Sequence, residues 1–180
     1  MIAKHNLTNG HRDLMTPGRV GLWLFLAVAT MVFAALISAY IVRMGSSDWH
    51  SLPKPGLLWV NTAILLLSSA AFHWALVADR QGHIRSVRLG VVAGAVLSAL
   101  FFVGQVWAWL VLQKLGYFLS ANPSSSFFYL LTAVHGAHLL GGLIVAAWTV
   151  RTRERLQLFV TYWHFLTAVW VVLFALIVLT

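Results

Sequence analysis

The stretch LQLFVTYWHFLTAVWVVLFALIVL, residues 156–179, decides the fold of this chain. It contains no Lys, Arg, Asp or Glu, and most of its side chains are aliphatic or aromatic. An α-helix rises about 1.5 Å per residue, so about 20 apolar residues cross a bilayer core of about 30 Å. Residues 156–179 are therefore predicted to form one membrane-spanning helix.

Four further stretches have a similar length and the same lack of charge: residues 20–42, 56–78, 89–112 and 127–150. Clusters of Gly, Pro, Ser and Asn, which are typical of turns, lie between several of them. All four acidic residues lie outside these stretches. The pattern predicts an all-α protein, with a bundle of five transmembrane helices over residues 19–180 after a polar N-terminal tail over residues 1–18.

The composition excludes an ordinary soluble domain. Of the 180 residues, 61% are hydrophobic and 9% are charged, whereas a soluble domain carries roughly a quarter charged residues. The absence of Cys excludes disulfides and thiolate metal sites. The formal net charge of +8 would indicate a nucleic-acid partner in a soluble protein. In a chain this apolar, basic residues instead mark the cytoplasmic ends of membrane helices, so we expect no nucleic-acid partner.

The distribution of Lys and Arg predicts the orientation. Three of these residues lie on one side of the predicted spans: Arg43, Lys54 and Lys114. The other nine lie on the side of the N-terminal tail: Lys4, Arg12, Arg19, Arg80, Arg85, Arg88, Arg151, Arg153 and Arg155. Because cytoplasmic loops are enriched in Lys and Arg, we expect a cytoplasmic N terminus and a C terminus outside.

Histidines are the only ionisable side chains of the usual catalytic kinds inside the predicted spans: His73, His135, His138 and His164. An ionisable group within a membrane is costly and indicates function by default. The lack of Asp and Glu in the spans argues against an ion-coupled transporter, because such proteins commonly hold a carboxylate near the midplane.

Two metal-binding interpretations of these histidines compete with simple packing. His135 and His138 are three residues apart and share a helix face, but the zinc-binding pattern places His at i and i+4 with a Glu between them. His73 and His164 are expected at similar depth near the cytoplasmic face and are candidate haem ligands of a membrane b-type cytochrome. The alternative for all of them is hydrogen bonding between helices.

Small residues four apart predict close helix packing at Gly90 and Gly94, and at Ala137 and Gly141. The basic residues between the last two spans, Arg151, Arg153 and Arg155, have two interpretations. They hold an anionic lipid headgroup, or they only orient the chain.

Several motifs together resemble those of subunit III of the haem–copper oxidases, in the shorter form with five spans. The motifs are YWHF at residues 162–165 followed by VW at 169–170, TAVHGAHL at 132–139, GLWLF at 21–25, NT at 61–62, WA at 74–75 and, less strongly, Gln105. They follow the order in which the family has them and cover residues 19–180 approximately. Any one motif is weak, and the combination carries the resemblance.

The resemblance implies a non-catalytic subunit of a terminal oxidase in the bacterial cytoplasmic membrane. It implies a bundle that packs against the catalytic subunit I, stabilises it through turnover and holds phospholipid in a cleft between helices. Haem and copper are then expected in the partner and none in this chain. The candidate phospholipid and packing network comprises Trp23, His135, His138, Arg151, Trp163 and His164. The related subunits that accompany nitric oxide reductases are the alternative within the resemblance.

The chain departs from the family's pattern at several positions inside the predicted spans. The family usually has Glu where this chain has Ala29 and Ala108, and commonly has Asp where it has Thr167. A His pair at the end of the second shared helix is replaced by Leu76 and Val77. The resemblance therefore implies a divergent branch of the family. Whatever those carboxylates do in proton entry or in binding lipid headgroups, this chain cannot do it in the same way.

Overall fold

The fold is described from a computed structural model, which describes residues 16–49, 56–119, 122–149 and 153–180. Five helices make up this part of the chain: α2 (Pro17–Met44), α3 (Leu57–Arg80), α4 (Ile84–Lys114), α5 (Pro123–Thr149) and α6 (Arg153–Leu179). The described residues contain no strand. All five helices are long and apolar enough to cross a membrane, which confirms the predicted all-α bundle.

Each helix begins or ends a few residues beyond its predicted apolar stretch. The first helix starts at Pro17, where a proline without an N–H fits the first helical position. The turn between α3 and α4 places Gly82 at φ 76°, a left-handed conformation that glycine adopts readily. Residues 1–15 of the predicted N-terminal tail and Val150, the last residue of the fourth predicted span, lie outside the described residues.

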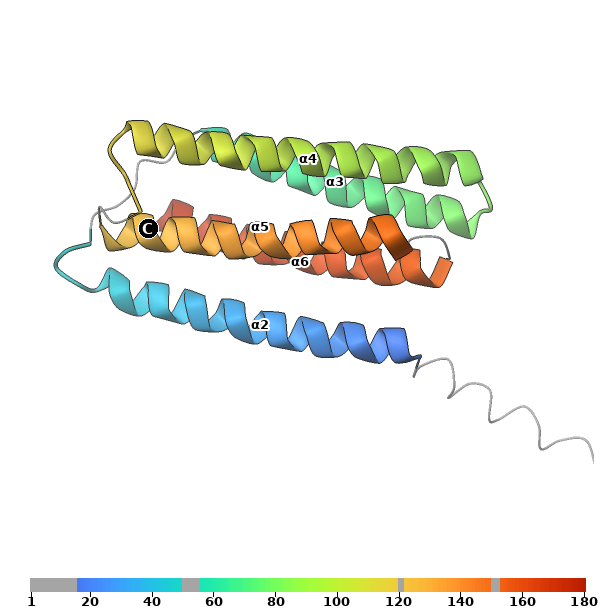
Figure 1. Cartoon of the computed structure of the whole chain (residues 1–180), viewed down its shortest axis with the longest axis horizontal. Coiled ribbons are helices and arrows are strands. Elements are labelled where there is room, and N and C mark those ends of the chain that lie inside the picture. The colour runs from blue at the N-terminus through green and yellow to red at the C-terminus, as the bar shows by residue number, and fades with distance from the viewer. Residues whose placement is uncertain (1–15, 50–55, 120–121, 150–152) are drawn as a thin grey trace, which may run out of the picture.

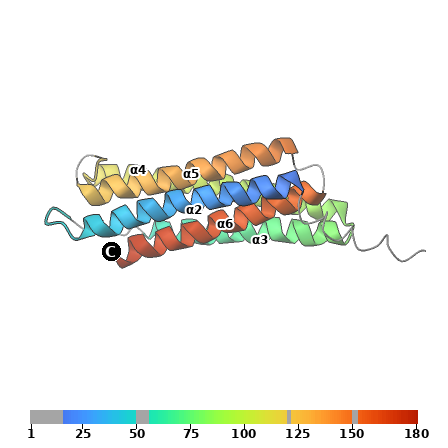
Figure 2. The same ribbon diagram turned by 90° about the horizontal axis from the view of Figure 1, so that it is seen from below.

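The helices run side by side along one long axis in three layers (Figure 1). α3 and α4 form one outer layer, α5 and α6 the middle, and α2 the opposite side. Seen from below, α6 lies between α2 and α3 (Figure 2). The start of α2, the α3–α4 turn and the start of α6 share one end of the bundle, which we call the basic end. Its described basic residues are Arg19, Arg80, Arg85, Arg88, Arg153 and Arg155, whereas Arg43 and Lys114 lie at the other end.

The closest pair of helices is α3 and α4. A Cβ on Gly94 would lie 2.7 Å from the Phe72 ring, and one on Gly90 would lie 2.9 Å from Cβ of Ala75. The predicted packing role of these two glycines is confirmed, since no larger residue fits without a shift. Between the same helices, the hydroxyls of Ser68 and Ser98 are hydrogen-bonded at 2.9 Å.

α6 supplies much of the core. Trp170 is buried, its ring packs edge-on against Phe101 at 5.0 Å, and its Nε1 donates to Oγ1 of Thr62 on α3 at 3.0 Å. By contrast, α2 packs against α5 and α6 only among the described helices, and most of its large side chains are exposed. Its far end is fixed by a 2.5 Å hydrogen bond between Tyr40 and Thr180.

Candidate functional site

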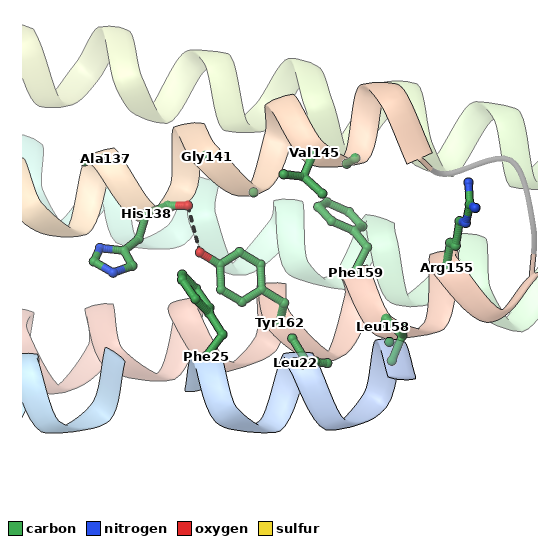
Figure 3. Close-up of a pocket in the computed structure, with 14 residues that line it drawn as sticks. Leu22, Phe25, Ala137, His138, Gly141, Val145, Arg155, Leu158, Phe159 and Tyr162 are labelled. Atoms are coloured by element: carbon green, nitrogen blue, oxygen red, sulfur yellow. Dashed lines mark hydrogen bonds between the residues drawn. The ribbon is translucent and has the colours of Figure 1, made fainter. Parts of the chain in front are cut away.

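A cavity of about 720 Å³ opens at the basic end between the start of α2, the second half of α5 and the start of α6 (Figure 3). We call it the α2–α5–α6 cavity. Its volume lies within the about 300–1,000 Å³ typical of ligand sites. Its lining comprises Gly18, Gly21, Leu22 and Phe25 from α2, Ala137, His138, Gly141, Gly142, Val145 and Ala146 from α5, and Arg155, Leu158, Phe159 and Tyr162 from α6.

Tyr162 makes a polar contact between α6 and α5 at the wall of the cavity. Its hydroxyl donates to the backbone oxygen of His138 at 2.9 Å, as the dashed line in Figure 3 shows. Its ring lies over Gly142, because a Cβ there would come within 2.5 Å of the ring. The absence of a side chain at residue 142 therefore permits the ring position that shapes the cavity.

The neighbouring pair Ala137 and Gly141 does not pack against another helix, contrary to the prediction from their spacing. Both residues line the cavity, and nothing lies within 4 Å of a Cβ placed on Gly141. Spacing identifies a helix face with small residues, but such a face can meet either a helix or an open cavity. Here the small residues widen the cavity.

The polar groups of the cavity are few and lie at its two ends. Arg155 lies at the basic end and His138 at the inner end (Figure 3). His138 Nδ1 lies 2.8 Å from the Val134 oxygen and donates to it, because a carbonyl oxygen only accepts. The arrangement suits an elongated apolar molecule with one anionic end near Arg155.

Ala29, where the resemblance led us to expect Glu, lies on the face of α2 that contacts His138. The His138 ring contacts Phe25 at 6.1 Å and Phe33 at 5.3 Å, measured between ring centroids. Phe25 and Phe33 flank Ala29 by one helical turn on each side, and Ala29 is 2% exposed. A side chain at residue 29 would therefore point at His138.

Three consecutive side chains of the YWHF motif lie in three different parts of the bundle. Successive residues of a helix are about 100° apart. Tyr162 lines the cavity, whereas Trp163 is fully buried, with 5.1 Å between the ring centroids of Trp163 and Phe72. Nε1 of Trp163 has no hydrogen-bond partner among the described residues. His164 lies on the outer side of α6 towards α3, where its Nδ1 is 2.7 Å from the Ser69 hydroxyl.

His135 and His138 do not form a metal site with other residues. His135 is fully buried among Phe33, Phe101 and Trp170, and neither ring nitrogen has a hydrogen-bond partner among the described residues. No group of three or more His, Cys, Asp or Glu side chains suited to a metal occurs in the described part of the chain.

His73 and His164 are adjacent, as their predicted similar depth allows. His73 Nδ1 and His164 Nε2 are 3.2 Å apart, which is a hydrogen-bond distance. A metal between two imidazole nitrogens needs about 4 Å, since each metal–nitrogen bond is about 2 Å long. In this arrangement the pair has no space for an iron between these two nitrogens, so the geometry favours hydrogen bonding over haem ligation.

The five described residues of the predicted network lie in different parts of the bundle. Of these five, His138 alone lines the cavity; His135 and Trp163 are in the core, and His164 is on the α3 side. Trp23 is 66% exposed on α2, and Arg151 lies outside the described residues. Sequence reasoning missed Phe25, Arg155 and Tyr162 as members of one cavity, although each belongs to a stretch that it had singled out.

Comparison with known proteins identifies the family. No family model matches the chain. Cytochrome c oxidase subunit 3 of Thermostichus vulcanus is 30% identical over 173 residues, which cover 88% of this chain and 85% of the relative. The chain belongs to the oxidase subunit 3 family. Cytochrome c oxidase subunit 3 of Synechocystis sp. is 31% identical over 188 residues, covering 95% and 78% of the two chains.

The oxidase subunit 3 family includes relatives named for different electron donors. Cytochrome bo(3) ubiquinol oxidase subunit 3 of Pseudomonas putida is 28% identical over 178 residues, which cover 89% of this chain and 84% of that relative. Similarity to both kinds of relative extends along most of the chain. Membership in the family and the five apolar helices show a multi-pass membrane protein.

In this chain, the positions at which the resemblance led us to expect a carboxylate are all inside the bundle. Ala29 is 2%, Ala108 0% and Thr167 6% exposed. The Thr167 hydroxyl donates to the backbone oxygen of Trp163 at 2.9 Å, so it needs no other partner. The core around these positions is therefore built without buried charge.

Proposed function

We propose that this chain is the non-catalytic subunit III of a haem–copper terminal oxidase, which reduces oxygen to water and couples this reaction to proton translocation. Similarity to named oxidase subunits along nearly the whole chain is the observation that carries the proposal. Haem and copper belong to the catalytic subunit in this proposal, and this chain stabilises that subunit. The membrane is the bacterial cytoplasmic membrane.

The basic end of the bundle faces the cytoplasm in this proposal. Its described basic residues outnumber those at the other end, and Arg153 forms an ion pair with Asp79 across α3 and α6, with 3.5 Å between Nε and Oδ2. Cytoplasmic enrichment in Lys and Arg gives an N terminus inside and a C terminus outside. The α2–α5–α6 cavity then opens at the depth of the cytoplasmic leaflet.

The α2–α5–α6 cavity binds a phospholipid. Its walls are apolar, its small residues leave space for an acyl chain, and Arg155 lies at the end where a headgroup belongs. Attraction between one Arg and an anionic headgroup contributes about 1 kcal/mol. A lipid here would fill the weakly packed side of α2 and tie it to α5 and α6. His135, Trp163 and His164 act in packing instead.

Purification of the complex tests the assignment. We expect the chain, tagged and extracted gently from its own membranes, to bring down a partner with haem absorbance and oxygen consumption. The isolated chain should show no haem band. Haem retained by the isolated chain and lost in both His73→Ala and His164→Ala would establish a b-type cytochrome instead. Nitric oxide reduction by the purified complex would place the chain with the nitric oxide reductases.

A matched pair of variants tests the lipid site. Gly141→Leu places a side chain in the cavity, where nothing lies within 4 Å of its Cβ, whereas Ala133→Leu introduces leucine at an exposed position of α5 outside the cavity. Native mass spectrometry should show loss of bound phospholipid in Gly141→Leu only. Equal lipid retention in both variants would exclude this cavity as the site.

The headgroup contact has its own test. Arg155→Gln should reduce the preference for anionic over zwitterionic phospholipid by several-fold, because about 1 kcal/mol corresponds to roughly fivefold. Arg85→Gln removes an exposed charge at the same end of the bundle and serves as the control. If both variants keep the wild-type lipid preference, Arg155 only helps to orient the chain.

A further inference from the structure

The outer groove between α3 and α6 contains a chain of hydrogen bonds that is open at one end. The groove has a volume of about 840 Å³, and its walls include Leu66, Trp74 and Val172. Within it, Ser69 contacts His164 Nδ1 at 2.7 Å, and His164 Nε2 contacts His73 Nδ1 at 3.2 Å. The chain reaches His73 through Nδ1, which leaves Nε2 of this exposed side chain able to bond to a further group.

This polar chain faces outward from the middle of the bundle. His73 and His164 are exposed, whereas Ser69 is 5% exposed. His164 is two residues from the midpoint of α6, about 3 Å along its axis, and His73 is about 7 Å from the midpoint of α3. With the helix midpoints at the middle of the bilayer, both imidazoles lie inside a hydrocarbon core of about 30 Å.

That depth excludes a lipid headgroup as the missing partner. Headgroups begin about 15 Å from the middle of the bilayer, beyond the reach of His73. Hydrocarbon offers no hydrogen-bonding group, and ionisable side chains in membrane proteins almost always face other protein, a cavity or each other. A groove with two exposed imidazoles at this depth is consequently unsuited to plain lipid.

Another outer surface of the bundle shows the opposite character. The exposed side chains of α4 between residues 92 and 110 are aliphatic, among them Val96, Leu100 and Val103, except for Trp107. Such a surface suits lipid, and the indole N–H of Trp107 is its only side-chain hydrogen-bonding group between these residues. The two surfaces differ in what they can contact, although each includes a helix of the α3–α4 layer.

We infer that the α3–α6 groove is the face on which a transmembrane helix of another oxidase subunit docks, with a carboxylic or hydroxyl side chain hydrogen-bonded to His73. The inference rests on the proposed function, that the chain is a subunit of a larger membrane complex. The described spans offer imidazole and no carboxylate at their middle, so the complementary group comes from the partner. The apolar groove walls receive the rest of that helix.

Photocrosslinking in the intact complex tests the docking face. A benzophenone amino acid replaces Leu66 or Val172 in the groove, which are 48% and 53% exposed, and Leu100 or Val96 on α4, which are 49% and 53% exposed. We expect adducts with an integral membrane subunit from both groove positions, and lipid adducts alone from both α4 positions. Subunit adducts from α4 with only lipid or a small molecule at the groove would overturn the inference.

The histidine contact is tested separately. His73→Leu should weaken retention of the chain in the complex by roughly threefold, the change expected for one interhelical hydrogen bond in a membrane, and His73→Gln should retain it better. Equal retention in wild type, His73→Leu and His73→Gln would refute the hydrogen bond to a partner. If the unmodified chain brings down no oxidase, the proposed function itself fails; if it does and the groove gives no subunit adduct, only the docking face fails.

Discussion

The α3–α4 pair and α2 represent two ways of placing a helix in the same bundle. α3 and α4 approach so closely that Gly90 and Gly94 leave no space for a Cβ, and a hydroxyl pair joins them at Ser68 and Ser98. α2 has most of its large side chains exposed and leaves a cavity of about 720 Å³ against its neighbours.

The difference shows what glycine does in each place. In α4, glycine lets two helices meet directly, and dispersion contacts hold them. In the α2–α5–α6 cavity, Gly21 and Gly141 face open space and leave a volume for another molecule, whereas Gly142 makes room for the Tyr162 ring. Membrane helices gain little from the hydrophobic effect on association, so the quality of packing decides which contact is strong without help from lipid.

The largest expected effect compares leucine at a closed and at an open glycine. Gly94→Leu forces a side chain into Phe72 and should destabilise the bundle by at least about 3 kcal/mol or prevent its accumulation, the upper range for overpacking. Gly21→Leu on α2 adds the same group where nothing lies within 4 Å of the Cβ, and should leave stability nearly unchanged in lipid-free detergent, in which no phospholipid occupies the cavity. Steric trapping or SDS titration measures both. Equal losses would show that α2 is packed as tightly as α4.

A smaller effect is expected at the contact between α6 and α3. Trp170→Phe removes the hydrogen bond from Nε1 to Thr62 and part of a fully buried ring. The variant should lose about 1–3 kcal/mol of unfolding free energy, from one buried hydrogen bond and a small cavity. Restoration of stability by Thr62→Val in the same background would identify the hydrogen bond as the main term; no restoration would assign the loss to packing.

Single hydroxyls on the two sides of the bundle should differ little. Ser68→Ala removes the contact with Ser98 in the α3–α4 pair, and Tyr40→Phe removes the contact with Thr180 that fixes α2. Each should cost about 0.6 kcal/mol, the average for an interhelical hydrogen bond in a membrane. Double-mutant cycles measure the two couplings. A coupling several times larger at Tyr40 would mean that α2 depends on this one bond.

The smallest effect concerns the turn after α2. Two groups lower the pKa of Asp48 below its ordinary value: the Ser46 side chain, through a hydrogen bond, and the Arg43 guanidinium, whose Nη2 lies 2.7 Å from Oδ2 of Asp48. Because the folded-state pKa is the lower one, ionised Asp48 stabilises the fold above its unfolded-state pKa, and this contribution is lost as pH falls through the folded-state pKa. NMR titration should show the lowered pKa in wild type and a higher one in Ser46→Ala. An unchanged pKa in the variant would assign the shift to Arg43.

Helix positions were predictable from sequence because a bilayer imposes one length and one composition on every span. The spacing of small residues predicted helix packing correctly at Gly90 and Gly94 but not at Ala137 and Gly141. Spacing shows only that a helix has a face of small residues, and whether another helix packs on that face depends on the neighbouring element. The local rule carries no information on which helix lies opposite.

The site was less predictable because consecutive residues of one motif point in different directions. Tyr162, Trp163 and His164 read as a unit in the sequence, but each contacts a different part of the bundle. The adjacency of His73 and His164 depends on the rotation of α3 and α6 about their axes. That rotation depends on contacts elsewhere along the two helices, such as the hydrogen bond between Trp170 and Thr62.

The position of α2 has a consequence for the order in which the protein is made. α2 is the first of the described helices in the chain, but its neighbours are α5 and α6, the last two. α3 and α4 can pair as soon as α4 is inserted, whereas α2 must wait in the bilayer without a partner until α5 arrives. A helix that waits must be stable alone in lipid, and α2 has the most apolar core of the five. Its apolar surface is thus a requirement of biosynthesis as well as of the finished bundle.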